Sequence, residues 1–216
     1  MVFDVRAIMP KERVELAAEK QKEYAEHYAR ILQEKFRYYR KPENAAAFDK
    51  IALNIGLWHA ASKGECDHPK YGLFLFGEPG TGKTTALQLL SGLCGIDYIT
   101  AAEMAKRFAI GGHQAFWEMA EQYKFAHLIV DDIGCGDTAK NYGSEVPFIE
   151  FIRDRERVWT EKNVCTFFTS NAKNRDDVIQ RYGQSVCSRL LGMCEFIHFK
   201  GDDNRDKYKG KSKWQR

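Results

Sequence analysis

From residue 70 onwards, short apolar runs alternate with longer segments of helical periodicity. Five of these runs have strand length and are rich in apolar residues, which is typical of strands buried on both faces of a parallel sheet. They cover residues 71–76, 96–100, 127–132, 164–170 and 194–199. Helices are predicted to begin near Lys83 and Ala101 and to cover residues 146–162, 175–183 and the segment that follows. This alternation predicts an α/β domain in which crossover helices cover a parallel sheet.

The earlier part of the chain has helical periodicity only. Apolar side chains that include Val14 and Tyr28 recur at steps of three and four residues, which predicts one amphipathic helix over residues 10–40. Pro42 interrupts it, and a second helix is predicted over residues 44–61. Packing of the first helix on its own domain and docking of a partner protein explain the apolar stripe equally well. We divide the chain into a helical extension at 1–43, a domain at 44–205 and a basic tail at 206–216.

Composition restricts the class of protein further. With 216 residues, 44% of them hydrophobic, the chain can bury the core of one principal domain. The net charge of +3 arises from 33 basic and 30 acidic residues, so nucleic-acid contacts would depend on local patches. No apolar run approaches the ~20 residues that span a bilayer, and the amino end lacks a signal-sequence pattern. We expect a soluble, cytoplasmic protein without a membrane contact.

The six cysteines are scattered without a C-x-x-C pair. Several lie inside apolar runs, where a free cysteine packs as a small hydrophobe, and this distribution fits a reducing compartment. Cys66 and His68 are an isolated pair of metal-binding residue types, so we interpret them as loop residues rather than as a zinc site.

The first chemical motif is FGEPGTGKTT at residues 76–85, directly after the first apolar run. It matches G-x-x-x-x-G-K-[ST] at Gly77, Gly82, Lys83 and Thr84. Glycines let backbone N–H groups turn toward phosphate oxygens, and the following helix directs its positive end at them. Lys83 would reach the β- and γ-phosphates of a bound triphosphate, and Thr84 would ligate Mg²⁺. The predicted binding residues are Gly77, Glu78, Pro79, Gly80, Thr81, Gly82, Lys83, Thr84 and Thr85.

Two later strand ends carry polar side chains suited to phosphate chemistry. The apolar run LIV at residues 128–130 is followed by Asp131 and Asp132. Asp131 would hold Mg²⁺ through its water shell, and Asp132 would orient or deprotonate the attacking water. Asn171 follows the run at residues 164–170. If that strand lies between the first and the third, Asn171 would face the γ-phosphate and its water.

The carboxyl-terminal part supplies candidate phosphate-binding arginines. Arg181, Arg189 and Arg205 lie in and after RYGQSVCSRL. The planar guanidinium group keeps its charge and grips phosphate oxygens, and an arginine offered to a neighbouring subunit can accelerate hydrolysis by ~10³ or more. Most helical arginines are solvated, so the order of the motifs matters more here than their spacing.

The series GEPGTGKTT, LIVDDIG, TFFTSN, RYG…SRL and FKGDDNR resembles the AAA+ ATPases of the DnaC/DnaI type, the loaders of the bacterial replicative helicase, and their IstB-like relatives. The resemblance extends from Asn44 to Arg205. It implies a five-stranded parallel sheet in the order 5-1-4-3-2, with a reduced or absent helical lid. ATP and Mg²⁺ are the implied cofactors. It assigns Walker A to Lys83 and Thr84, Walker B to Asp131 and Asp132, sensor 1 to Asn171, the arginine finger to Arg189 and sensor 2 to Arg205.

The resemblance implies an ATPase of DNA replication that forms homo-oligomers in the ATP state and loads a replicative helicase onto single-stranded DNA. Two other functions stay open, namely a transposition helper that binds duplex DNA and a transposase, and a small-molecule kinase. Asp132 stands where AAA+ motors commonly have glutamate, so we expect slow hydrolysis that serves as a switch and is stimulated by oligomerisation or DNA.

Two segments are candidates for DNA contact. The tail combines lysines with Tyr208 and Trp214, which suits single-stranded DNA and a disordered solubilising tail equally well. Residues 107–125 contain a Gly-Gly pair among aromatic residues and are predicted to form a functional loop. Its aromatic residues either cap the core or face a central channel, and we expect core packing for Phe108, Phe116 and Trp117.

Overall fold

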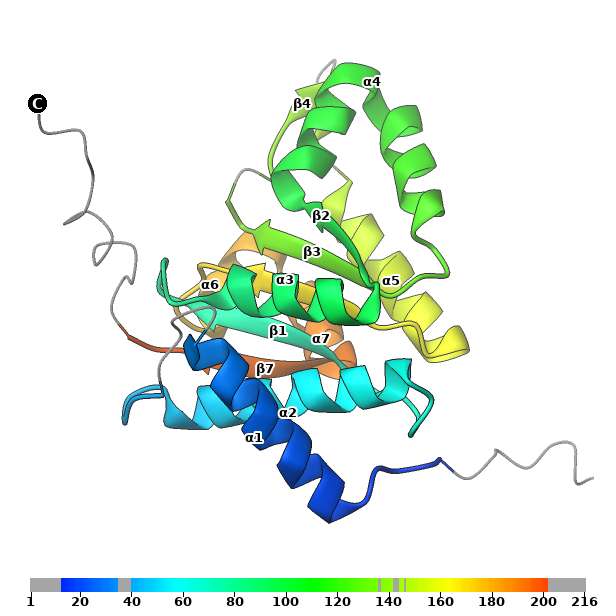
Figure 1. Ribbon diagram of the computed structural model, residues 1–216. Coiled ribbons are helices and arrows are strands. Elements are labelled where there is room, and N and C mark those ends of the chain that lie inside the picture. Colours follow the sequence, from blue (N-terminus) through cyan, green and yellow to red (C-terminus); the bar gives the residue numbers. More distant parts are fainter. Residues whose placement is uncertain (1–12, 35–39, 136, 142–143, 146, 202–216) are drawn as a thin grey trace, which may run out of the picture.

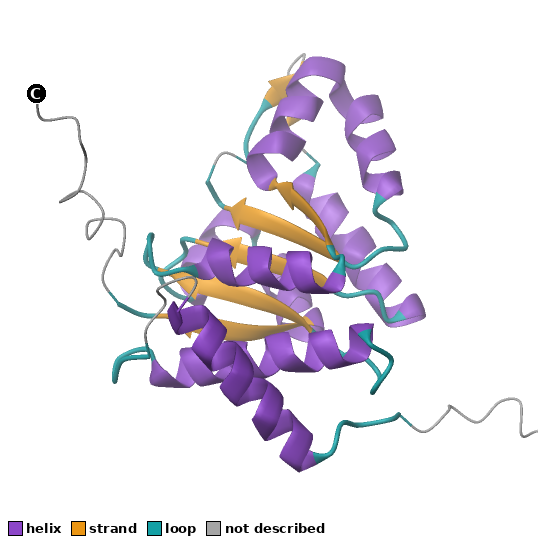
Figure 2. Cartoon of the chain, in the orientation of Figure 1, coloured by secondary structure: helices purple, strands orange, loops and turns teal. Residues whose placement is uncertain are grey.

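A computed structural model describes residues 13–34, 40–135, 137–141, 144–145 and 147–201 (Figure 1). A central sheet carries helices on both faces (Figure 2). Its strands are β1 (Gly72–Gly77), β2 (Asp97–Thr100), β3 (Leu128–Ile133), β6 (Thr166–Ser170) and β7 (Cys194–Phe199). The short strands β4 (Lys140–Asn141) and β5 (Ser144–Glu145) form a separate antiparallel pair. The helices are α1 (Ala18–Glu34), α2 (Ala45–Ser62), α3 (Lys83–Cys94), α4 (Ala101–Gln122), α5 (Phe148–Lys162), α6 (Arg175–Tyr182) and α7 (Gln184–Met193).

The five strands lie in the order β2-β3-β6-β1-β7, and every neighbouring pair is parallel. This is the predicted order 5-1-4-3-2 read from the opposite edge, so the predicted fold is confirmed. β6 enters the sheet between β1 and β3, and it is buried along its whole length. The carboxyl ends of these three strands therefore meet at one edge, where α/β proteins place their ligands.

Alternation along the strands divides the interior into two cores. Leu73 and Leu75 of β1 pack into the core beneath α1, α2 and α3, while Phe74 packs into the core beneath α4 to α7. Phe167 and Phe168 of β6 divide in the same way. Successive side chains of a strand point to opposite faces, so apolar runs of this kind require cover on both sides. The result is the expected three-layer arrangement.

The predicted helix over residues 10–40 is wrong at its amino end. Residues 13–17 are not helical, and α1 begins only at Ala18. Val14 N–H donates to Asp67 Oδ2 at 2.9 Å, and the Asp67 N–H donates to the Val14 carbonyl at 2.9 Å. This long-range pairing holds the segment against the loop after α2, so Val14 is 60% exposed instead of lying on the apolar stripe. The other end of the prediction lies partly outside the described residues.

Helix α1 packs its apolar face on α2. Tyr28 and Leu32 are buried in the same core as the sheet residues, and Tyr24 packs against it. The two helices approach closely at Gly56, where a Cβ atom would lie 2.7 Å from Tyr24 Cβ. In the described part of α1, the apolar face thus packs within this chain. The domain boundary at residue 43 stays a prediction.

The predicted functional loop at residues 107–125 is mostly helical. It lies largely within α4, which bends at Gly112 (φ 63°, ψ −154°) into two arms that rise above the sheet edge (Figure 1). Phe108 and Phe116, one on each arm, are fully buried, as expected for core packing. Ile110 beside the bend is 76% exposed.

A buried arginine fixes the opposite, amino-terminal edge of the sheet. Arg155 of α5 is 3% exposed and donates to Thr166 Oγ1 at 2.7 Å and to the carbonyls of Tyr123 and Ala126 at 2.7 and 2.9 Å. Burial lowers the pKa of its guanidinium to about 10. All of its hydrogen bonds in the described structure go to neutral oxygens, and they tie the loop before β3 to the start of β6.

Two further observations concern membrane-spanning helices and metal sites. None of the helices in the described ranges is long and apolar enough to cross a membrane. All six cysteines are free, and His68 stacks on Trp58 with ring centroids 5.1 Å apart. Among the described side chains, no cluster of histidine, cysteine and acidic residues has the size of a metal site.

The α1–α2 contact can be tested at Gly56. Gly56→Ala should lower the free energy of unfolding by about 1–3 kcal/mol, because the new methyl group overlaps Tyr24. Gly92→Ala in α3 is the matched control, since its Cβ would meet no atom within 4 Å, and it should raise stability by about 0.5–1 kcal/mol. Urea unfolding followed by circular dichroism measures both. Equal effects of the two substitutions would contradict the packing.

Candidate nucleotide-binding site

The loop after β1 has the backbone of an anion-binding turn. Gly77, Gly80 and Gly82 have φ values of 128°, 74° and 99°, which side-chain-bearing residues rarely adopt. A Cβ atom at Gly77 would also lie 2.1 Å from the Phe199 carbonyl oxygen of β7. α3 begins directly after Gly82, so its amino end and the N–H groups of its first turn face the loop. The sequence-predicted glycines therefore stand where the turn requires them.

Lys83 crosses the interior of this turn. Its side chain is buried, with 6% of the residue exposed, and Nζ donates to the carbonyls of Gly77 and Glu78 at 2.8 Å each. Thr81 Oγ1 donates to the Glu78 carbonyl at 2.8 Å and closes the turn from the other side. A buried ammonium group beside inward-turned N–H groups is a site for a multiply charged anion.

The buried carboxylate of Asp131 lies beside the start of α3. Its Oδ1 accepts hydrogen bonds from Thr84 Oγ1 at 3.0 Å and from Thr169 Oγ1 at 2.5 Å, and its Oδ2 accepts one from Tyr98 OH at 2.5 Å. Burial raises the pKa of the Tyr98 phenol above its ordinary value, and the hydrogen bond to Asp131 and the charge of that carboxylate raise it further. This carboxylate, carried by β3, thus accepts hydrogen bonds from side chains of β2, β6 and α3.

A β-bulge interrupts β3 at its two aspartates. Val130 pairs with Phe168 and Ile133 pairs with Ser170, so Asp131 and Asp132 stand opposite the single residue Thr169. Asp132 has φ 59°, a conformation uncommon for residues other than glycine. The Thr169 hydroxyl joins the two, because it donates to Asp131 Oδ1 and accepts from Asp132 N–H at 2.8 Å.

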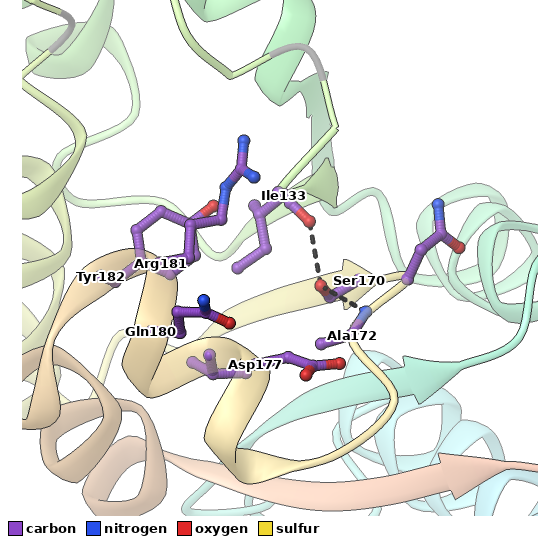
Figure 3. A pocket seen from close by; sticks show the side chains of 10 residues that line it. Ile133, Ser170, Ala172, Asp177, Gln180, Arg181 and Tyr182 are labelled. Atoms are coloured by element: carbon purple, nitrogen blue, oxygen red, sulfur yellow. Dashed lines mark hydrogen bonds between the residues drawn. The ribbon is translucent and has the colours of Figure 1, made fainter.

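Asp132 and Asn171 meet directly above this bulge. Asn171 Nδ2 donates to Asp132 Oδ1 at 2.9 Å. Ser170, between Thr169 and Asn171, donates to the Ile133 carbonyl at 2.9 Å and accepts from the Ala172 N–H at 3.2 Å (Figure 3). The predicted residues Lys83, Thr84, Asp131, Asp132 and Asn171 therefore gather at one edge of the sheet.

A cavity of about 360 Å³ adjoins this edge between the ends of β3 and β6 and helix α6 (Figure 3). Asp137, 4% exposed, lies near it and accepts from Gly134 N–H at 3.0 Å, Arg181 Nη2 at 2.7 Å and Tyr182 OH. Burial alone would raise the pKa of Asp137, but hydrogen bonds from Tyr182, Arg181 and Gly134 bring it below its ordinary value. Asp137 thereby ties the turn after β3 to α6.

The two predicted arginines that the structure describes pair with carboxylates outside the phosphate loop. Arg181 pairs with Asp137, and Arg189 of α7 pairs with Glu156 of α5. The buried Nε of Arg189 has no hydrogen-bond partner among the described residues. Arg205 lies outside the described residues. β7, the last strand before Arg205 in the chain, ends beside the phosphate loop, since Phe199 pairs with Gly77.

Sequence reasoning missed three residues that organise this edge. Thr169 precedes Asn171 by two positions, but its bridging role depends on the bulge. Tyr98 lies in an ordinary strand pattern, and Asp137 lies in a polar loop. Nothing in their sequence neighbourhoods distinguishes either residue from a surface side chain.

The residues present fit a nucleoside triphosphate with Mg²⁺. The turn offers backbone N–H groups and the Lys83 ammonium for phosphate oxygens. Thr84 and Asp131 place a hydroxyl and a carboxylate oxygen 3.0 Å apart, and such oxygen ligands are those that Mg²⁺ prefers.

The strand order and the glycine-rich turn before α3 define the AAA+ P-loop NTPase fold, and solved structures of this class have the same fold. The DnaC helicase loader has a TM-score of 0.52 at 19% identity, over 76% of this chain and 99% of that one. DnaI has a TM-score of 0.56 at 19% identity, over 73% and 87%. AMPPCP-bound DnaA from Aquifex aeolicus has a TM-score of 0.54 at 18% identity, over 79% and 52%.

No protein-family model matches the sequence of this chain. No curated protein matches it either. The likeness to DnaC and DnaI is therefore a likeness of fold, in which this chain spans nearly all of the DnaC structure.

The contact between Asp137 and α6 can be tested by Asp137→Asn. This change should lower the free energy of unfolding by about 1–3 kcal/mol at neutral pH, because an amide cannot accept all three donors. The pKa of Asp137 is lower in the folded state, so its stabilisation is present above the unfolded pKa and is lost as the pH falls through the folded pKa.

The difference between wild type and Asp137→Asn should consequently shrink as the pH is lowered from about 5 to about 2. Asp97→Asn is the control, because Asp97 is exposed on β2. Urea unfolding at a series of pH values measures the effect. A difference that does not change with pH would contradict a charged Asp137 in this cluster.

Proposed function

We propose that this protein is an ATPase that uses Mg²⁺ and acts in DNA replication as a loader of a replicative helicase. The observation that supports it best is the continuous set of hydrogen bonds from Thr84 through Asp131 and Thr169 to Asp132 and Asn171. It joins the phosphate loop to the two strand ends that hydrolysis requires. The shared fold with DnaC and DnaI supports the replication role.

In this proposal, each polar residue has one task. Lys83 and the N–H groups at the start of α3 bind the β- and γ-phosphates. Thr84 and Asp131 hold Mg²⁺, which supplies neutralisation of phosphate charge when bound. Asp132 orients the water and accepts its proton, and Asn171 fixes the Asp132 carboxylate through Oδ1.

The geometry also favours slow turnover. Aspartate is one methylene shorter than glutamate, so the Asp132 carboxylate approaches the attacking water only because of the β-bulge. One of its oxygens is engaged by Asn171 at 2.9 Å. We therefore propose that ATP serves as a switch between states, with hydrolysis stimulated by oligomerisation or by DNA. The turnover rate of a processive motor would contradict this part of the proposal.

Arg189 is proposed to complete the site of a neighbouring subunit. It lies on α7 and is ion-paired with Glu156, so it is available to a neighbour only after this pair opens. Arg205 is proposed as a second phosphate contact within the chain. It is six residues beyond Phe199, whose backbone lies beside Gly77, and six extended residues span up to about 20 Å.

Single-stranded DNA is the proposed nucleic-acid partner. The DnaA structure with AMPPCP and single-stranded DNA has this fold, with a TM-score of 0.51 at 15% identity over 79% of this chain and 52% of that one. In this chain, the bend of α4 projects beyond the sheet and carries the exposed Ile110. We propose that this bend and the basic tail contact the strand.

A mixing experiment tests the shared site. Asp132→Asn and Arg189→Ala should each slow ATP hydrolysis by about 10² or more, since one removes the base and the other the neighbour's contact. An equimolar mixture should regain activity, because the Asp132→Asn subunit still presents Arg189 to the intact site of its neighbour. Phosphate release measures all three samples.

Glu156→Gln is the matched control for this experiment. It breaks the same ion pair as Arg189→Ala but keeps the arginine, so it should hydrolyse ATP at least as fast as wild type. Normal hydrolysis by Arg189→Ala, or a mixture that stays inactive, would contradict a shared site.

Capture from cells of the native host tests the biological role. With ATP, wild type should retain a replicative helicase and bind single-stranded DNA more tightly than duplex, with an affinity that falls steeply as salt rises. Lys83→Ala should lose the ATP-dependent part of both. Retention of a transposase together with duplex preference would support the transposition function instead, and phosphorylation of a small molecule would support a kinase.

A further inference from the structure

The Asp131 carboxylate is held unevenly by its three hydroxyl partners. Thr84 and Thr169 both donate to Oδ1, whereas Oδ2 accepts from Tyr98. Thr84 and Thr169 belong to the phosphate loop and to the central strand β6. Tyr98 belongs to the edge strand β2 and lies outside every nucleotide-binding motif in the sequence.

The register of the sheet explains how Tyr98 reaches this carboxylate. Tyr98 pairs with Ile129 and Thr100 pairs with Asp131. Residues two apart on a strand share a face, so Tyr98 lies diagonally across from Asp131 on the side covered by α3. Its ring packs against the core that contains Ile129. A long side chain with a terminal hydroxyl group is needed to span this diagonal.

The hydrogen bond at Oδ2 restricts the orientation of the carboxylate. The terminal torsion of an aspartate has a broad energy profile, so the group rotates easily unless both oxygens are held. With Oδ2 fixed by Tyr98, Oδ1 stays toward Thr84, the other oxygen ligand proposed for the metal. Loss of a partner that orients a metal ligand typically lowers metal affinity by about 10–100-fold.

We propose that Tyr98 is a positioning residue that orients Asp131 and thereby sets the affinity of the site for Mg²⁺. This inference rests on the proposed function, in which Mg²⁺ and ATP bind at this edge. Tyr98 itself does not touch the phosphates or the metal in this scheme. It acts only through Asp131, so its substitution should change the affinity of the site for Mg²⁺ and not the affinity for the nucleotide.

Tyr98→Phe is the sharpest test, because it removes one oxygen atom and leaves the ring in the core. Thr169→Val would be less informative, since Thr169 also accepts from the Asp132 N–H and supports the bulge. Tyr71→Phe is the matched control, because Tyr71 is 44% exposed and its ring contacts Trp159. Thermal unfolding without Mg²⁺ establishes that both variants are folded.

The measurement is the binding of a fluorescent ATP analogue, first in EDTA and then titrated with Mg²⁺. Tyr98→Phe should bind the analogue as wild type does in EDTA, but it should need about tenfold more Mg²⁺ for the half-maximal response. Saturating Mg²⁺ should restore its ATP hydrolysis. Tyr71→Phe should follow wild type throughout.

Two failures are distinguishable in this design. If wild type and Tyr98→Phe respond at the same Mg²⁺ concentration, the positioning role is overturned while the proposed ATPase stands. A Tyr98→Phe variant that loses affinity equally in EDTA and in Mg²⁺ also overturns it, because the effect is then general. If wild type binds no nucleotide, the proposed function fails and this inference fails with it.

Discussion

The insertion of β6 between β1 and β3 is the constraint on which the rest of the structure depends. A strand that is buried on both faces must satisfy its backbone groups on both edges, and β6 does so through parallel pairing with two neighbours. This pairing brings the phosphate loop, the bulge of β3 and Asn171 to one edge from positions far apart in the chain. The central position of β6 in the sheet thus determines where polar groups from separate segments of the chain meet.

The chemistry at that edge then depends on hydroxyl groups. Asp131 and Asp132 would point to opposite faces of a regular strand, and the bulge opposite Thr169 lets both serve the same edge. Thr169 holds the two by donating to one and accepting from the other. Because Asp131 and Thr169 are buried and these groups are hydrogen-bonded to one another, the bonds restrict the side-chain orientation of Asp131 and the backbone at Asp132.

Much of this could be predicted from the sequence, because strand length, apolar runs and motif order are local properties. Lys83, Asp131 and Asn171 are recognisable from spacing and from the strands before them. The bulge could not be predicted, because a one-residue shift of pairing is decided by the partner strand. The non-helical start at Val14 and the buried Arg155 depend likewise on contacts with distant segments, which no local pattern records.

The packing of α1 has a consequence for association. The apolar face of α1 packs on α2, and most of the side chains that α1 leaves exposed are charged. They include Glu19, Lys20, Lys22, Glu23, Glu26 and Arg30. A protein that approaches this helix meets a surface with charges of both signs. Such a surface favours fast association in a selected orientation over the formation of a long-lived buried interface. Ionic strength would then govern how often such encounters succeed, and residence time would be determined by other surfaces.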